Sequence, residues 1–268
     1  ATATFGGSGK FVDRPTITYV PITGSEFNQN FMTPVPPSAV LFLLQAGWPA
    51  SLILPMTVEG INGLRAQRSQ GLRQRAGDKD FYRVIELFSI LQDAGAMSMR
   101  LVGGAGQSES TVILIRRERI APEILAVADE LARLLGIRSD APKFTVTYVE
   151  IAANDTELAM LTRSTLSIML ELRAHVDVPP EDIAEGRVQA TLPVPAESGR
   201  ELRLHVDIRS SLDRPEDAFV SVSYRDRWFW IDDRDFASKR TFSFLMLLFS
   251  LTETGGKEGL PLVTIPAG

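Results

Sequence analysis

The chain has 268 residues, of which 44% are hydrophobic and 23% charged, a composition typical of a folded globular protein with an ample core. Its formal net charge is −5, from 28 basic and 33 acidic residues, and it has no long basic run, so we predict no nucleic-acid partner. The absence of cysteine excludes disulfides, thiol nucleophiles and cysteine metal sites from these residues. The two histidines, His175 and His205, lie far apart without another His or Cys nearby, and we predict no metal and no cofactor.

Residues 1–20 are predicted to form an extended Gly-rich β arm, because small polar and apolar residues alternate along it. Its glycines disfavour a self-standing strand and are typical of a close backbone approach, so we expect the arm to pair with a neighbouring subunit or with an upstream segment. The candidate interface residues of the arm are Phe5, Gly6, Gly7, Gly9 and Phe11. The sequence starts without Met, and we expect its N-terminus to be cut or matured.

The first elements after the arm are predicted from proline, glycine and alternation. Two prolines at the start and Gly47 at the end predict a short helix within 36–47. Apolar residues then alternate over 54–58, which predicts a strand that Pro55 places at a sheet edge or a bulge. The pair Asn62–Gly63 predicts a turn directly after it.

The remaining chain interleaves helical and strand patterns irregularly. Helical spacing predicts helices over 80–95, over 122–135 and from Asn154 or Asp155 to residue 172, before a last long helix. The strand patterns cover 97–102, 111–116, 144–150, 187–192, 201–208, 219–224, 228–231 and 262–265. We therefore predict an α+β fold with mixed or antiparallel sheets and about five helices. Residues 21–268 form its globular region, with 138–142 as a candidate division between two subdomains.

The segment 65–80 is rich in arginine. A run of this kind is typical of a solvated, mobile loop, and alternatively it can grip an acidic partner or anionic lipid headgroups. The aromatic residues that a single-strand nucleic-acid binder interleaves with its basic residues are absent from it. The candidate docking residues are Arg65, Arg68, Arg73 and Arg75.

The stretch WFWIDDRDFASKRTFSFLMLLFS, residues 228–250, raises the question of a membrane segment. Its apolar run is about 15 Å long as a helix, against about 30 Å of bilayer hydrocarbon, so it cannot cross a membrane. A helix that is apolar nearly all round is typical of a buried central helix. We therefore predict a buried C-terminal helix.

Three aspartates stand where the predicted strand of this stretch meets the helix: Asp232, Asp233 and Asp235. Carboxylates at this place cap free backbone N–H groups, suit the positive end of the helix dipole and pair with the basic residues that follow. Alternatively, the three aspartates and His205 form the acid–base or cation site of a periplasmic hydrolase or ligand-binding domain. Under the first interpretation, the stretch has a structural role: the aspartates start the helix that packs against the core.

Three blocks of the sequence resemble a family of uncharacterised Gram-negative envelope lipoproteins: DRPTITYVPITGSEF (13–27), LFLLQAGWPASLILPMTVEGINGLR (41–65) and DAFVSVSYRDRWFWIDDRDFASKRTFSFLMLLFSLTETG (217–255). The resemblance spans nearly the whole chain, and its last block is the most specific. It implies a secreted precursor with a lipid-attachment cysteine and a further N-terminal section. It also implies a location on the periplasmic side of the outer membrane, and it supplies no catalytic residues.

The leading hypothesis is a non-enzymatic envelope lipoprotein domain that mediates assembly, with itself as a homo-oligomer or with other envelope proteins. The sequence contains no nucleophile elbow, no phosphate-binding loop of the correct spacing and no dinucleotide fingerprint. Gly-rich arms from several subunits can close a barrel, because closure satisfies backbone groups in lipid. An outer-membrane complex or pore is therefore a candidate assembly, with attachment through a lipid anchor or an N-terminal section.

Overall fold

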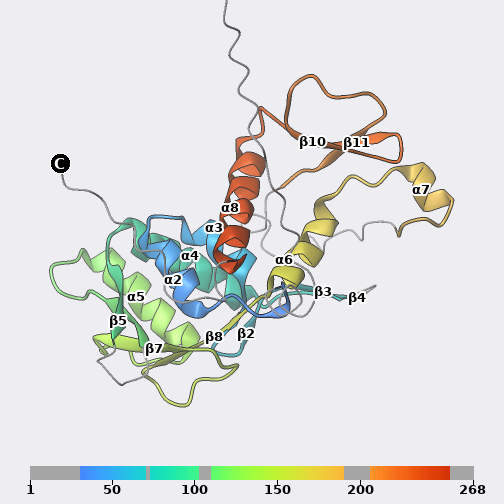
Figure 1. Ribbon diagram of the computed structural model, residues 1–268. Helices are drawn as coiled ribbons and strands as arrows, with labels where there is room; N and C mark the ends of the chain where they lie inside the picture. The colour runs from blue at the N-terminus through green and yellow to red at the C-terminus, as the bar shows by residue number, and fades with distance from the viewer. Residues whose placement is uncertain (1–30, 71–72, 103–109, 190–205, 254–268) are drawn as a thin grey trace, which may run out of the picture.

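The computed structural model describes residues 31–70, 73–102, 110–189 and 206–253. These residues contain seven α-helices, one mixed sheet and two antiparallel sheets, which confirms the predicted α+β class; the sequence predicted about five helices. Figure 1 shows a larger lobe, built from α2 to α5 and a six-stranded sheet, and a smaller lobe that holds β10, β11 and α7. Helices α6 and α8 run between the two lobes. The predicted arm, 1–20, and the predicted strand 262–265 lie outside the described residues.

The larger sheet has the order β2–β1–β8–β7–β6–β5 and is mixed, because only the β7–β8 pair is parallel. Its strands are β1 Val58–Ile61, β2 Leu64–Arg65, β5 Met97–Val102, β6 Ser110–Ile115, β7 Lys143–Thr147 and β8 Glu157–Thr162. The predicted turn at Asn62–Gly63 joins β1 to β2, with φ of +46° and +83°. Residues 138–142, the candidate division, connect α5 to β7 within this lobe.

Four helices cover this sheet and enclose the main core: α2 Pro37–Gln45, α3 Ala50–Thr57, α4 Lys79–Asp93 and α5 Pro122–Leu135. The predicted helices α2, α4 and α5 are confirmed, with proline in the first turn of α2 and of α5. Gly136 ends α5 at φ +64°, the left-handed conformation in which glycine is unstrained. Helix α4 lies between α3 and α5.

The predicted strand over 54–58 is wrong, because most of that segment belongs to α3. Six of its eight residues are buried, so apolar residues occur on all sides of the helix and no helical period appears in the sequence. Pro55 lies inside the helix, where it removes one backbone hydrogen bond. The prediction followed the alternation around Pro55, whereas burial between α2 and α4 decided the structure.

The predicted helix from residue 154 to 172 is also wrong in its first half, which forms β8. This strand lies between β1 and β7 and is buried along most of its length, so it appears as an apolar run without period-two alternation. Asn154 closes a turn instead, accepting a hydrogen bond from the backbone N–H of Thr156 at 2.9 Å. Helix α6, Thr165–Leu172, begins later, and the Ser164 hydroxyl caps it.

The smaller lobe contains a three-stranded antiparallel sheet of order β10–β11–β9, with β9 Arg209–Ser211, β10 Ala218–Tyr224 and β11 Arg227–Asp232. The predicted strands at 219–224 and 228–231 are confirmed. Of the two other predicted strands, 187–189 is not a strand and 206–208 contributes one isolated bridge, Val176–Ile208. Their remaining residues lie outside the described part of the chain. The short helix α7 spans Pro180–Ala184.

The predicted C-terminal helix is α8, Phe236–Glu253, and its burial is confined to one face among the residues whose exposure is described. Its buried face comprises Ser238, Thr241, Phe244, Leu245 and Leu248. Phe244 contacts Trp48 of the larger lobe, with ring centroids 5.2 Å apart. The opposite side exposes 81% of Phe236 and 55% of Met246 to solvent. Among the described residues, no helix combines the length and hydropathy needed to span a membrane.

Candidate interaction surface

The β10–β11 hairpin is partly or fully exposed along both strands, and of its residues only Ile231 is buried. Arg225 and Asp226 form its two-residue turn at φ +50° and +60°, a combination that defines a type I′ turn. Such turns match the twist of the flanking strands and fix their register. Tyr224 therefore lies opposite Arg227, and Ser221 lies opposite Trp230.

One face of the hairpin stacks arginine on tryptophan. The guanidinium carbons of Arg214 and Arg209 each lie 5.3 Å from a ring centroid, over Trp228 and Trp230 respectively. Arg209 also pairs with Asp207 at 3.1 Å and with Asp232 at 2.8 Å, and the Asp207 hydrogen bond chiefly raises its pKa. These cations are held by carboxylates and aromatic rings within the lobe, and we assign them a stabilising role.

The other face of the hairpin is apolar and exposed. Val222 and Tyr224 of β10 expose 61% and 60% of their surface. Towards α7 this face ends at a shallow depression of about 460 Å³, which Phe229 lines together with residues that precede and follow α7. Arg227 pairs there with Glu181 of α7 at 2.8 Å, so the hairpin and the helix are joined across the depression.

Among the described residues, β10 has a free edge, which a register shift interrupts between Ala218 and Val220. Its only strand partner there is β11, and its sequence, AFVSVSY, has no charge and no proline. Sheet edges are usually shortened, charged or covered, because an open row of N–H and C=O groups pairs with other chains. The other edges follow this rule: β2 and β9 have two and three residues, and β5 carries Arg100.

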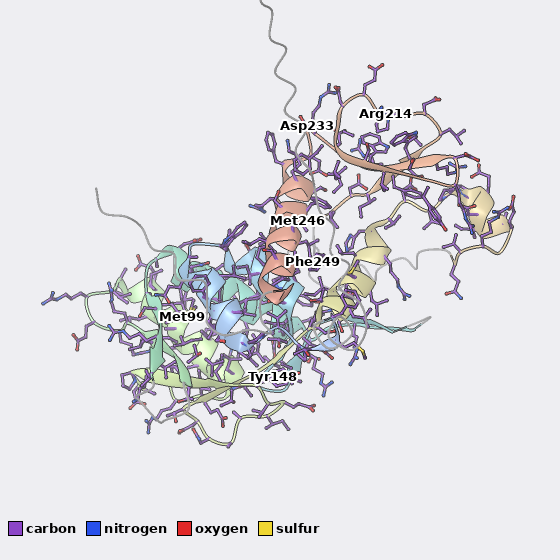
Figure 2. All side chains as sticks on the ribbon, viewed as in Figure 1. Met99, Tyr148, Arg214, Asp233, Met246 and Phe249 are labelled. Carbon is purple, nitrogen blue, oxygen red and sulfur yellow. The ribbon has the colours of Figure 1, made fainter. Side chains whose placement is uncertain are left out.

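The predicted aspartate cluster lies at the base of this lobe, and Figure 2 shows Asp233 beside the start of α8. Asp232 pairs with Arg209 and also accepts from the backbone N–H of Arg234 at 2.9 Å. Asp233 pairs with Lys239 at 2.6 Å, and Asp235 accepts from the backbone N–H of Ser238 at 3.1 Å. The contacts agree with the capping and ion-pairing interpretation.

The three aspartates do not form a common binding site in the described part of the chain. In the part of the chain that it describes, no group of three His, Asp or Glu side chains is arranged to hold a metal ion. His205, the fourth member of the alternative site, lies outside that part. The described residues therefore do not provide the clustered carboxylates that the alternative acid–base or cation site would need.

The predicted arginine segment forms a hairpin, β3 Arg68–Gln70 and β4 Arg73–Arg75, and its description as a loop is wrong. Arg65 forms an ion pair with Glu150, and Arg68 pairs with Glu59 at 2.8 Å. Arg73 and Arg75 lie on β4, and the backbone register sets Arg75 opposite Arg68. Two of the four candidate docking arginines are thus neutralised within the chain. The candidate residues of the arm, 5–11, lie outside the described residues.

Sequence reasoning missed the exposed edge of β10, although it predicted the strand. The signal was the absence of charge and proline from 218–224, but whether a strand lies at an edge depends on the sheet order. The comparisons with known proteins add no further guide: no family model, no curated protein and no solved structure matches the chain.

Proposed function

We propose that the chain is a non-enzymatic assembly module that forms a homo-oligomer through its smaller lobe. The observation that carries the proposal is the edge of β10 that no described strand covers; β10 is an uncharged strand of seven residues with exposed apolar side chains. Monomeric proteins avoid such edges, because they recruit strands from other chains. A partner strand on this edge binds the open N–H and C=O groups and covers the apolar face beside them.

The surroundings of the edge support binding in preference to catalysis. The aspartates nearest to it are each engaged with a base or a helix N-terminus, and the tryptophans are stacked under arginines. Exposed apolar residues continue from the hairpin onto the start of α8, where the rings of Phe219 and Phe242 meet at 6.2 Å. A surface of this kind suits a protein partner, since burying apolar area is the main driving force of association.

The location belongs to the same proposal and rests on the family resemblance alone. We place the module in the bacterial cell envelope, on the periplasmic side of the outer membrane, attached through a lipid anchor or an N-terminal section. In an assembly there, the Gly-rich arm and the arginine hairpin supply further contacts, with the same subunits or with other envelope proteins.

Light scattering on a sizing column tests the proposal. We expect the mass to rise with protein concentration, from near the 29.5 kDa of one chain toward at least twice that value. The increase should persist in high salt, because apolar and backbone contacts are screened little by ions. A mass of one chain at every concentration contradicts the proposed function.

A further inference from the structure

We infer that the larger lobe binds an extended peptide of another protein, which adds to the edge of β5 and carries an acidic residue between two apolar ones. This site goes beyond the proposed homo-oligomer and does not depend on it, because β5 and β10 belong to different sheets. Peptides are recognised in this way when the backbone of an edge strand gives affinity and a neighbouring groove selects side chains. The larger lobe offers both features at β5.

The edge of β5 presents a regular row of backbone groups. Strand β5 is the last strand of the larger sheet and pairs with β6 over six residues without a register shift. The N–H of Arg116 donates to the carbonyl oxygen of Ala96 at 2.7 Å, and this bond fixes the phase of the ladder. Because hydrogen-bonded and non-hydrogen-bonded positions alternate in an antiparallel pair, the N–H and C=O groups of Met97, Met99 and Leu101 point away from β6. An added strand would bond to these groups.

An open groove of about 570 Å³ lies between α2 and the β5–β6 pair. Its lining is apolar where it is deepest in the lobe, because Leu41 of α2 and Met99 of β5 are only 1% and 5% exposed. Phe42 of α2 also lines it and exposes 54% of its surface. Alternate side chains of a strand share a face, so the peptide residues paired with Met99 and Leu101 point to the same side as Met99. The groove therefore selects apolar residues at these two peptide positions.

Arg100 supplies the charge that the peptide complements. It stands between Met99 and Leu101 in the strand, is exposed and also lines the groove. Among the described residues, no carboxylate pairs with it. The peptide residue opposite Arg100 is flanked by the two apolar ones, and an acidic side chain there faces the guanidinium across the two strands. A charge on a sheet edge discourages strand addition in general, whereas a strand of opposite charge gains a contact from it.

The order apolar–acidic–apolar also indicates where the peptide comes from. A second copy of β5 does not fit, because its sequence, MSMRLV, would set a base where the partner needs an acid. The segments of this chain that the structure does not describe do not fit either. None of 1–30, 71–72, 103–109, 190–205 and 254–268 contains an acidic residue between two apolar residues. The occupant is therefore an extended segment of a different protein.

Selection from random peptides displayed on phage tests the inference with the full chain, carried out in parallel on the unmodified protein and on Arg100→Glu. The unmodified protein should enrich peptides with an acid between two apolar residues, and the variant should enrich lysine or arginine at that place. Arg116→Glu, at an exposed arginine that does not line the groove, is the control and should keep the acidic preference. By fluorescence anisotropy, Arg100→Glu should weaken binding of a selected acidic peptide roughly fivefold or more.

Backbone methylation of a selected peptide separates strand addition from contacts made by side chains alone. A strand turns alternate N–H groups toward its neighbour, so N-methylation of one alternate set should abolish binding and N-methylation of the other set should not. Equal effects of the two sets, or an acidic preference that survives in Arg100→Glu, overturns the inference. So does the absence of enrichment on both proteins, which is expected if the groove is already filled. The mass of the unmodified protein does not enter these results, so the homo-oligomer stands or fails separately.

Discussion

Gln92 shows how one half-buried side chain fixes a junction between helices. Its amide nitrogen donates to the carbonyl oxygens of Leu44 and Trp48 at 2.9 and 2.8 Å, and its amide oxygen accepts from the N–H of Ala50 at 2.8 Å. These three backbone groups belong to the end of α2, the connection and the start of α3. A single amide therefore binds backbone groups at the ends of both helices.

The substitution Gln92→Glu tests this role with almost no change of shape. The carboxylate cannot donate, so the carbonyl of Trp48 loses its donor, the carbonyl of Leu44 still accepts from the N–H of Gly47, and both face a negative charge. We expect the free energy of unfolding to fall by roughly 1 to 3 kcal/mol, because a part-buried carbonyl is left unsatisfied. Urea denaturation measures it, and Gln45→Glu, exposed on α2, should change it by less than about 0.5 kcal/mol. Equal effects of both substitutions would show that the amide has no special role.

Asp235 allows the capping interpretation of the aspartates to be separated from a chemical one. Its carboxylate accepts from the N–H of Ser238, the third residue of α8, as an N-cap does. We expect Asp235→Ala to lower the free energy of unfolding by about 1 kcal/mol. Asp140→Ala, in an exposed ion pair with Arg138, should have little effect on stability. Loss of calcium binding in a titration, with an unchanged melting temperature, would favour the hydrolase or ligand-binding alternative.

Between elements, the clearest polar link joins α4 to α5. Arg83 donates to both carboxylate oxygens of Glu130, at 2.8 and 2.9 Å, and to Glu86 at 2.9 Å. The hydrogen bond from Arg83 lowers the pKa of Glu130 below its ordinary value of 4.5 and raises that of the guanidinium. Because the folded pKa is the lower one, the link stabilises the protein above pH 4.5 and is lost as pH falls through the folded pKa.

Comparing Glu130→Gln with the unmodified protein across pH tests this link. We expect the variant to be less stable at neutral pH, and the difference to narrow as pH falls below 4.5 and to close below the lowered folded pKa, where Glu130 is neutral in the unmodified protein too. In an Arg83→Gln background the same substitution should show no such pH dependence, since the cation is absent. A difference with the same pH profile in both backgrounds would assign it to another group.

The helices that could be predicted from apolar spacing are those with one buried face and one solvent-exposed face. Helices α4 and α5 each have one buried and one exposed face, so their apolar residues recur with the helical period. Helix α3 and strand β8 are buried on nearly all sides, and neither carries the period that identifies it. The aspartate cluster was predictable because it is contiguous, whereas its partner Arg209 lies on a neighbouring strand and depends on the sheet order.

The molecule as a whole divides its stability and its proposed self-association between two lobes. The larger lobe holds most of the hydrophobic core, between a mixed sheet and four helices. The smaller lobe has a half-exposed sheet, and helices α6 and α8 run between the two lobes in Figure 1. A surface that binds a partner can remain apolar in this arrangement, because the fold does not depend on burying it.

The mass of Val222→Lys, measured by sedimentation beside the unmodified protein, is the decisive experiment. Val222 is 61% exposed in the single chain, so the lysine should leave the fold intact and place a charge on the edge strand of the smaller sheet. Val102→Lys, at a 52% exposed valine on the edge strand of the larger sheet, is the matched control. We expect two chains for the unmodified protein and the control, and one chain for Val222→Lys. Equal masses for all three would contradict assembly through β10.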